Sequence, residues 1–539
     1  MRIAIAQINP ILGDLEYNKN KIIENIISLS LKKAELIIFP EASLFGYQPF
    51  DLLERKSLVD LQLKKLKEMT RSIPQGVFVL VGGFDKNKKK GRPYFNAAFL
   101  CQKNKIVKTF YKELLPTGDV FDESRFIEKG SLKNNFFKIG SKNFLITICE
   151  DIWAWDYSSH KSTYLENPIL KLPRKKLDLV INMSASPFFK KKFNQRIEVA
   201  KKTAVYLKAP LVYVNLVGGQ DEVIYDGQSF ILDHKGRLIN KMMSFEEDQN
   251  LFELETLKTW NRTVQVETEI ELMRKALITG IYDFCKKIGI SKVHLGLSGG
   301  VDSALVAALA VDALGSQNVS VFALPTHFNS IESYQSAQKL ASNIGLELKK
   351  IDIETTFQHI KKILDEEFQL TQFSVVHENL QSRIRGIFMM SYSNISSSLL
   401  LTTGNKSEYA TGYATLYGDM CGGLAVIGDL TKKEIYQMCS LYNKESEIIP
   451  EFILTRPPTA ELKPNQTDQD SLPAYDLLDK AVVNIVEKKN KLNNKTEYWL
   501  IKKLMYSEFK RWQAAPILKM SEHSFGRGRR YPIAHKALL

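Results

Sequence analysis

The feature that most constrains this chain is a turn that joins one strand to one helix in its second half. The apolar strand VHLGL (293–297) runs directly into SGGVDS (298–303), where a helix begins. Glycines let the backbone approach phosphate groups closely, and a helix N-terminus supplies amide donors and a dipole that favours anions. No Gly-Lys-Ser/Thr closes the loop, which excludes a Walker A motif. The segment therefore predicts an α/β domain that binds a nucleotide.

Strands and helices alternate around that loop. We expect helices at 269–289, 302–314, 331–344 and 378–394, and strands at 293–297, 319–325, 347–353 and 398–403. This alternation predicts a parallel, doubly wound sheet. The segment 456–473 is polar and rich in proline, and loops of this length inside compact domains are often functional lids.

The first half of the chain shows a second α/β pattern. Short β-rich runs end in Gly, Asn or Pro, and they lie at 2–7, 34–40, 76–84, 144–149, 177–184 and 209–215. The amphipathic helical pattern at 18–33 lies between two of them, so we expect a layered α/β unit whose sheets are buried on both faces. A length of 539 residues predicts two or three domains. The boundary is expected between about 250 and 270, which gives domains 1–255 and 256–539.

The composition is that of a globular protein without a polyanionic partner. Hydrophobic residues make up 44% and charged residues 25%, which excludes intrinsic disorder and collagen-like structure. The net charge is +14, but lysines are spread along both halves and no nucleic-acid-binding module is present. We therefore expect solvated charged faces and no nucleic-acid partner.

Cysteine usage and hydropathy indicate the compartment. The five cysteines show no CxxC or zinc-type spacing; they are Cys101, Cys149, Cys285, Cys421 and Cys439. The first 14 residues do not resemble a signal peptide, and no apolar run reaches the 18 or so residues that a membrane span needs. We expect a soluble, cytoplasmic protein in a reducing compartment, with no membrane partner.

Three residues that follow apolar strands form a candidate catalytic set: Glu41, Lys112 and Cys149. Each alone has a structural interpretation, since buried cysteines are common and charged residues near strand ends are usually solvated. Together they have the chemistry to cleave an amide through a thioester. A carboxylate can take the thiol proton and return it to the leaving amine, while an ammonium stabilises the oxyanion.

These three segments, in this order, resemble the nitrilase or carbon–nitrogen hydrolase superfamily over about residues 1–250. The resemblance implies an αββα sandwich with Glu41 as general base, Lys112 as transition-state stabiliser and Cys149 as nucleophile. It also implies contacts to glutamine from Gly118, Phe121, Glu123, Glu150, Ser186 and Lys192, with Glu123 as a supporting carboxylate. One departure is clear, because relatives usually carry Asn-Tyr where this chain has Thr117-Gly118. A tyrosine contact on the glutamine side is therefore missing.

The loop SGGVDS resembles that of the N-type ATP pyrophosphatases, which have an adenine-nucleotide α-hydrolase-like fold, form adenylates and release pyrophosphate. Four later segments, 378–386, 399–432, 456–479 and 519–535, closely resemble glutamine-dependent NAD synthetases, and this likeness covers essentially the whole chain. The implied ATP contacts are Gly296, Leu297, Ser298, Gly299, Gly300, Val301, Asp302, Ser303, Thr403 and Lys432. The implied contacts to deamido-NAD are Asn379, Arg383, Glu408, Asp419 and Lys519. Asp302 and Glu408 would hold Mg²⁺, which prefers carboxylate oxygens.

The resemblance implies a carbon–nitrogen ligase that amidates deamido-NAD to NAD with glutamine as the amido donor. An adenylate forms on the way, and AMP, pyrophosphate and glutamate are released. It further implies a homo-oligomer and an ammonia tunnel. Three alternatives stay open: amidation of a different acid, an ammonia-dependent synthetase with an uncoupled or degenerate amidase domain, and a non-catalytic nucleotide-binding or nucleic-acid-binding protein.

Overall fold

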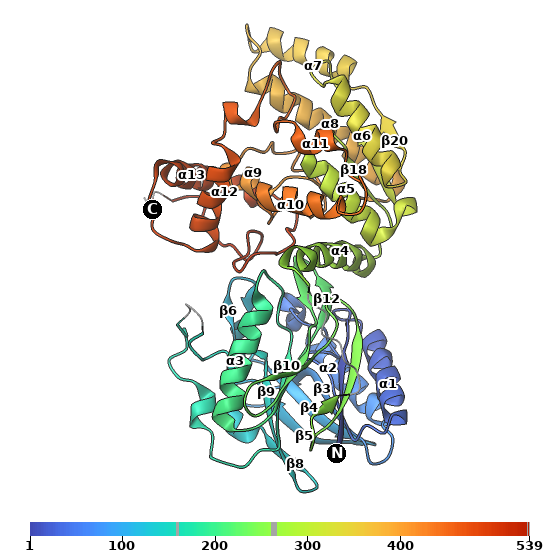
Figure 1. The fold of residues 1–539 in the computed structure, drawn as a ribbon, viewed down its shortest axis with the longest axis vertical. Coiled ribbons are helices and arrows are strands. Elements are labelled where there is room, and N and C mark those ends of the chain that lie inside the picture. Colours follow the sequence, from blue (N-terminus) through green and yellow to red (C-terminus); the bar gives the residue numbers. More distant parts are fainter. Residues whose placement is uncertain (158–160, 260–266, 536, 538–539) are drawn as a thin grey trace. The chain divides into compact units, whose positions relative to one another are not determined.

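The computed structural model describes residues 1–157, 161–259, 267–535 and 537. The chain forms two compact units, Met1–Gln220 with Ile224–Glu267, and Asp221–Val223 with Thr268–Leu539 (Figure 1). Residues 260–266, within the expected boundary region, lie outside the described residues. The boundary at 255/256 therefore stays a prediction.

The first unit is built on two sheets. Their strands are β1 (Arg2–Gln7), β2 (Leu36–Ile38), β3 (Phe78–Lys86), β4 (Tyr94–Gln102), β5 (Lys105–Tyr111), β8 (Phe136–Ile139), β9 (Lys142–Ile148), β10 (Leu179–Ser184), β11 (Leu211–Asn215), β14 (Phe230–Leu232), β15 (Leu238–Lys241), β16 (Asp248–Glu253) and β17 (Lys258–Thr259). One sheet has the order β17-β16-β1-β2-β3-β4-β5, and the other β15-β14-β11-β10-β9-β8. Two short ribbons complete the β structure: β6 (Thr117–Gly118) with β7 (Phe121–Asp122), and β12 (Val217–Gln220) with β13 (Val223–Asp226).

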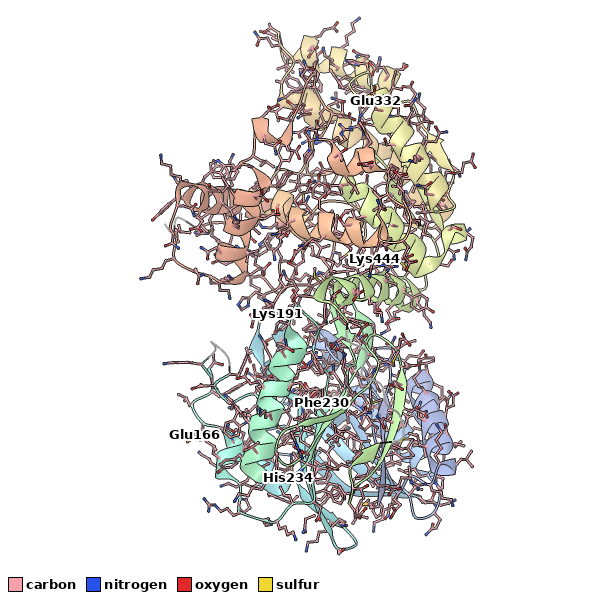
Figure 2. The ribbon with its side chains drawn as sticks, viewed as in Figure 1. Glu166, Lys191, Phe230, His234, Glu332 and Lys444 are labelled. Atoms are coloured by element: carbon pink, nitrogen blue, oxygen red, sulfur yellow. The ribbon has the colours of Figure 1, made fainter. Side chains whose placement is uncertain are left out.

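Helices cover the outer face of each sheet. They are α1 (Leu15–Leu31), α2 (Lys56–Thr70) and α3 (Lys192–Leu207), with short 3-10 turns at η1 (Phe50–Glu54), η2 (Glu123–Arg125), η3 (Leu132–Asn134), η4 (Cys149–Ile152) and η5 (Pro168–Lys171). Ile22 and Ile26 of α1 pack on the first sheet, and Val199 of α3 packs on the second. Figure 2 marks Phe230, a buried residue of the second sheet that stacks on Tyr213 with ring centroids 4.8 Å apart.

The inner faces of the two sheets share one apolar core. It joins Ile5 and Ile38 of the first sheet to Ile146 and Val212 of the second, and all four side chains are fully buried. Alternate residues of β1 and β2 pack on the helices instead, so both sheet faces are covered, as continuous apolar strands require. The predicted αββα sandwich is confirmed.

The second unit contains one parallel sheet of order β20-β19-β18-β21-β22. Its strands are β18 (Val293–Gly296), β19 (Val319–Ala323), β20 (Leu348–Lys350), β21 (Leu399–Thr402) and β22 (Leu424–Ala425). The first strand in sequence lies at the centre and the chain winds outward to both sides, so the predicted doubly wound fold is confirmed. Strand β20 is shorter than the predicted 347–353, with three residues in the sheet.

Helices and turns surround this sheet. The helices are α4 (Glu269–Ile288), α5 (Val301–Leu314), α6 (Ile331–Asn343), α7 (Glu354–Glu367), α8 (Val375–Ser396), α9 (Lys406–Thr411), α10 (Lys432–Tyr442), α11 (Glu451–Thr455), α12 (Tyr475–Val482), α13 (Lys495–Tyr506) and α14 (Glu508–Arg511), with η6 (Ser316–Asn318), η7 (Asp468–Asp470) and the π-helical turn η8 (Val483–Glu487). Every predicted helix is present. Within the described parts of the chain, no helix combines the length and apolar character that crossing a bilayer requires.

Candidate active sites

Glu41 follows β2 and lies fully buried in the first unit. Its Oε1 accepts hydrogen bonds from Lys112 Nζ at 2.8 Å and from Asn96 Nδ2 at 2.7 Å. Its Oε2 accepts the backbone N–H of Ala185 at 2.8 Å. Three donors therefore fix the orientation of this carboxylate, as a group that must move a proton along one defined path requires.

Lys112 follows β5 and lies between two carboxylates. Its Nζ donates to Glu41 and, at 2.7 Å, to Glu123 Oε1, which also accepts the hydroxyl of Tyr47. Burial opposes the ammonium form, but the charges of Glu123 and Glu41 prevail and raise the pKa of Lys112 well above its ordinary value. The side chain therefore stays cationic, as an oxyanion stabiliser must.

Cys149 follows β9 with its backbone in the left-handed region, at φ 42°. The carboxylate of Asp151 fixes this turn, because it accepts the backbone N–H groups of Ile148, Glu113 and Leu114 at 2.8–2.9 Å. Burial, and then the negative charge of Glu41, raise the pKa of the Cys149 thiol well above its ordinary value. The resting sulfur is therefore a protonated thiol beside a carboxylate that can act as its base.

Charged and aromatic groups lie around this centre. Burial raises the pKa of Glu150, and the positive charges of Lys112 and Lys192 oppose that rise, so these groups lie within electrostatic range of one another. The Nζ of Lys192 lies 3.7 Å from the ring centroid of Trp153, a cation–π contact. The site thus offers both an anionic and a cationic group to a zwitterionic ligand.

The remaining predicted glutamine contacts lie on the ribbon of β6 and β7 and on the segment that follows β10. Ser186 is buried; its N–H donates to Asn215 Oδ1 and its Oγ accepts from Arg196. Phe121 lines a cavity of about 30 Å³ together with Tyr47 and Glu123. Gly118 is exposed at φ 99°, and a Cβ added there would meet nothing within 4 Å. A side chain at position 118 would therefore have open space around it.

The phosphate-type loop of the second unit depends on one glycine. Gly299 has φ 83°, and a Cβ there would lie 2.3 Å from the carbonyl oxygen of Ser333. Ser303 Oγ donates to the carbonyl of Gly300 and accepts the N–H of Ser298, so hydrogen bonds close the loop over the start of α5. Backbone amides consequently gather at a helix N-terminus, the arrangement that binds phosphate groups.

Carboxylates and one lysine lie beside that loop. Asp302 accepts hydrogen bonds from Lys432 Nζ at 2.5 Å and from Asn405 Nδ2 at 3.0 Å. Burial and the charge of Asp302 raise the pKa of Glu408 well above its ordinary value. Asp468, in η7, lies close enough for its charge to act on Lys432 and Glu408. Lys432 therefore has several carboxylates within range of its charge.

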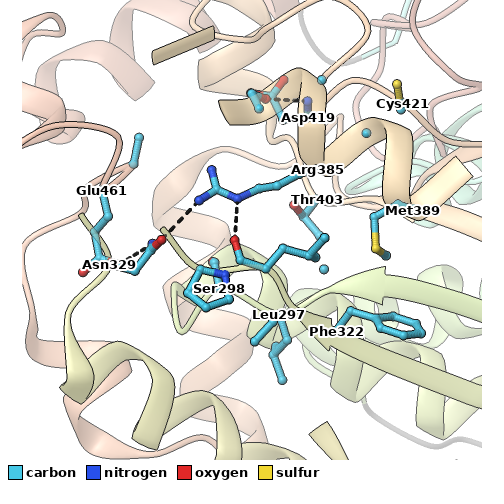
Figure 3. Close-up of a pocket in the computed structure, with 18 of the residues that line it drawn as sticks. Leu297, Ser298, Phe322, Asn329, Arg385, Met389, Thr403, Asp419, Cys421 and Glu461 are labelled. Atoms are coloured by element: carbon cyan, nitrogen blue, oxygen red, sulfur yellow. Dashed lines mark hydrogen bonds between the residues drawn. The ribbon is translucent and has the colours of Figure 1, made fainter. Parts of the chain in front are cut away.

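A cavity of about 270 Å³ opens at the carboxyl ends of β18, β19 and β21 (Figure 3). Five of the predicted residues line it: Gly296, Leu297, Ser298, Thr403 and Asp419. Arg385 also lines it and donates to the carbonyl of Leu324 at 3.0 Å and to Asn329 Oδ1 at 3.2 Å. Burial lowers the pKa of Arg385 to about 10, and burial raises that of Asp419 to about 6.

The other predicted dinucleotide contacts lie outside this cavity's lining. Asn379 accepts the hydroxyl of Thr415 at 2.7 Å, and Arg383 is exposed and donates to the carbonyl of Leu416 at 3.3 Å. Lys519 is buried, and its Nζ donates to the carbonyls of Ser521 and Glu522. Each of these three side chains therefore hydrogen-bonds a nearby part of the chain, and the cavity brings together only some of the predicted contacts to deamido-NAD.

Comparison with known proteins accounts for both halves. The family model described as carbon–nitrogen hydrolase matches residues 2–262, and the one described as NAD synthase matches residues 273–523. A glutamine-dependent NAD(+) synthetase from Synechocystis sp. is 40% identical over 99% of this chain and 98% of its own length. The chain belongs to the glutamine-dependent NAD(+) synthetases.

Other members of this family agree with that assignment. The synthetase of Thermotoga maritima is 37% identical, with 99% of both chains covered. The structure of the Acinetobacter baumannii synthetase in complex with ADP is 31% identical, with a TM-score of 0.78 over 99% of this chain and 98% of that one. The carbon–nitrogen hydrolase model matches residues 2–262. Within this half Lys112 donates to Glu41, and the charges of both act on Cys149. These observations argue against a degenerate amidase domain.

Several groups at the two candidate sites were not found from the sequence. They are Tyr47, Asp151 and Tyr164 in the first unit, and Arg385, Glu461 and Asp468 in the second. Asp151 follows Cys149-Glu150 directly, so its place beside a strand end was a usable signal. Arg385 stands two residues from Arg383, and only the orientation of α8 tells which of the two enters the cavity. Nothing in the sequence marks the other four.

Proposed function

We propose that this chain makes NAD from deamido-NAD, ATP and glutamine, with ammonia produced in the first unit and used in the second. The buried network of Glu41, Lys112 and Glu123 beside a protonated Cys149 is the observation that carries this proposal. Buried charged groups with perturbed pKa values cluster at functional sites. Amide cleavage would use this buried lysine and the two carboxylates beside it.

In the first half-reaction Glu41 takes the thiol proton of Cys149, and the sulfur attacks the side-chain amide carbon of glutamine. Lys112 stabilises the resulting oxyanion. Glu41 then returns the proton to the nitrogen, ammonia leaves, and a thioester remains. Water, deprotonated by Glu41, attacks the thioester, and glutamate and the free thiol are released. Glu150 and Lys192 are the groups that we propose for the α-ammonium and α-carboxylate of glutamine, with Gly118, Phe121 and Ser186 completing the pocket.

In the second half-reaction the nicotinate carboxylate of deamido-NAD attacks the α-phosphorus of ATP, and pyrophosphate leaves. Ammonia then attacks the acyl carbon of the adenylate, and AMP leaves as NAD forms. We assign the triphosphate to residues 298–303 and Lys432, and the nucleoside to the cavity that Leu297 and Thr403 line. Asn379, Arg383, Asp419 and Lys519 are the proposed contacts for deamido-NAD, and Arg385, which lines the cavity, adds a cation to this set.

Asp302 and Glu408 are the residues that would hold Mg²⁺ with the nucleotide. Both offer carboxylate oxygens, and because burial and the charge of Asp302 raise the pKa of Glu408, a bound cation would favour the ionised form of Glu408. The described residues contain no group of three or more His, Cys, Asp or Glu side chains placed to hold a metal ion. ATP phosphates would therefore supply the remaining ligands, and the cation would neutralise charge on the departing pyrophosphate.

The test is NAD formation by Cys149→Ala, supplied first with glutamine and then with ammonium. The matched control is Cys101→Ala, which removes another buried cysteine of the same unit. We expect Cys149→Ala to lose glutamine-driven synthesis by at least about 10³-fold and to keep ammonium-driven synthesis, while the control keeps both. If Cys149→Ala still makes NAD with glutamine, Cys149 is not the nucleophile. If wild type makes no NAD with either nitrogen source, deamido-NAD is not the substrate.

We also propose that the protein is a homo-oligomer of the cytoplasm. Helix α8 exposes Ile387, Met390 and Ile395, and such a row of apolar side chains marks interaction surfaces. All five cysteines are free thiols, which suits a reducing compartment. Sedimentation velocity of wild type and of Ile387→Lys tests the oligomer, since the charge should shift the protein toward monomer. Unchanged sedimentation would refute this surface.

A further inference from the structure

Tyr164 lies beside the proposed glutamine site, on the segment between η4 and η5. Its Oη donates a hydrogen bond to Glu150 Oε1 at 2.8 Å. The negative charges of Glu150 and Glu123 and the positive charge of Lys112 all act on its hydroxyl, so Tyr164 lies within electrostatic range of the catalytic residues.

The side chain of Tyr164 is half-buried, whereas that of its neighbour Leu165 is fully exposed. Local hydrogen bonds set this arrangement, because the N–H of Tyr164 donates to Ser162 Oγ, and the N–H of Ser162 donates to Asp156 Oδ1. The segment thus presents a hydroxyl, rather than an apolar side chain, to Glu150.

The hydrogen bond has a defined electrostatic effect. Burial raises the pKa of Glu150, and the Tyr164 hydroxyl opposes that rise because it donates to the charged form. Glutamine differs from a simple amide by its α-ammonium and α-carboxylate. A carboxylate that is ionised and held in one orientation is the group that can recognise the ammonium.

We propose that Tyr164 is a positioning residue for glutamine, which orients the Glu150 carboxylate toward the α-ammonium group of the substrate. This inference rests on the glutaminase activity proposed above. The pair formed by Tyr164 and Glu150 would therefore favour glutamine over amides that lack an α-amino group.

The test compares Tyr164→Phe with Tyr206→Phe, which removes a tyrosine hydroxyl on α3 that donates to the carbonyl of Leu170. In Tyr164→Phe we expect the KM for glutamine to rise about tenfold and kcat to change less than about twofold. The acid limb of kcat/KM should move to higher pH, because Glu150 loses the donor that favours its ionised form. Tyr206→Phe should match wild type.

Two further measurements separate positioning from a loss of local structure. Glutaramate, which is glutamine without the amino group, should inhibit wild type and Tyr164→Phe with the same inhibition constant within about twofold. In a Glu150→Gln background, Tyr164→Phe should change KM less than about twofold, because the partner is already altered. An unchanged KM in the single variant, equal losses for glutamine and glutaramate, or additive effects with Glu150→Gln would each overturn the proposal. Failure of the proposed function is distinct, because wild type itself would then release no ammonia from glutamine.

Discussion

Gly299 offers a sharp test of the phosphate loop, because the structure supplies its own control. Gly299 and Gly289 both have a left-handed backbone, with φ 83° and 78°. A Cβ at Gly289, the C-cap of α4, would meet nothing within 4 Å, whereas at Gly299 it would lie 2.3 Å from the carbonyl oxygen of Ser333. Alanine at either position carries the left-handed penalty of about 1 kcal/mol. At Gly299 it also requires a shift of at least about 0.7 Å, the difference between 3.0 and 2.3 Å.

We therefore expect Gly289→Ala to lower the melting temperature by about 2 °C and to leave ammonium-driven NAD synthesis unchanged. Gly299→Ala should lose about 10²-fold in kcat/KM for ATP, since misplacement of binding groups by about 1 Å costs that much. Thermal unfolding measures the melting temperature, and steady-state kinetics with ammonium as nitrogen source measure kcat/KM for ATP. If Gly299→Ala keeps its activity within about threefold, the close approach of this loop to α6 is not required for nucleotide binding, and the reasoning fails.

Three further predictions concern charged side chains. Glu41→Gln should lower glutamine-driven NAD synthesis at least about 10²-fold and leave ammonium-driven synthesis within about twofold; more than a tenth of wild-type glutamine activity would exclude Glu41 as the general base. Arg196→Met should lower the free energy of unfolding of the first unit by about 3–5 kcal/mol in chemical denaturation. The reason is that Arg196 donates to both carboxylate oxygens of Asp226, whose buried charge would lose its partner. Arg196→Met combined with Asp226→Asn should recover much of that loss. If the double variant is no more stable than the single one, the unpaired charge is not the cause. Burial raises the pKa of Asp419 from 3.8 to about 6, so its protonated form stabilises the fold below pH 4 and that contribution is lost as pH rises through about 6. Asp419→Asn should therefore gain stability relative to wild type as pH rises from about 4.5 to 7.5, by an amount that solvent screening at this exposed side chain keeps small, and a difference that does not change with pH would contradict this.

The sequence predicted those features that depend on period and position along the chain. The apolar runs became β1, β2, β3, β9, β10 and β11, because strands buried on both faces leave an uninterrupted apolar signal. Glu41 and Cys149 were predicted as neighbours because the carboxyl ends of strands are where open α/β sheets bind ligands. The same reasoning found the loop 298–303 at the end of β18.

Features that depend on loop geometry could not be predicted. Arg383 and Arg385 are two residues apart on α8, which places them about 200° apart around the helix axis. In the structure Arg385 is half-buried and lines the cavity, whereas Arg383 is exposed, the reverse of the emphasis that the sequence suggested. Tyr47 and Tyr164 contact acidic residues 76 and 14 positions away, and no periodic pattern encodes such pairs.

The high pKa of the Cys149 thiol suits the chemistry better than a preformed thiolate would. A thiolate at rest would add a third negative charge to Glu41 and Glu123, with Lys112 as the buried cation between those carboxylates. It would also leave Glu41 without a proton, and the nitrogen of an amide is expelled only after it has received one. Because the proton begins on sulfur and passes through Glu41 to the departing nitrogen, the charge of the site stays constant until the thioester forms. Burial therefore selects the protonation state from which both the attack and the departure can proceed.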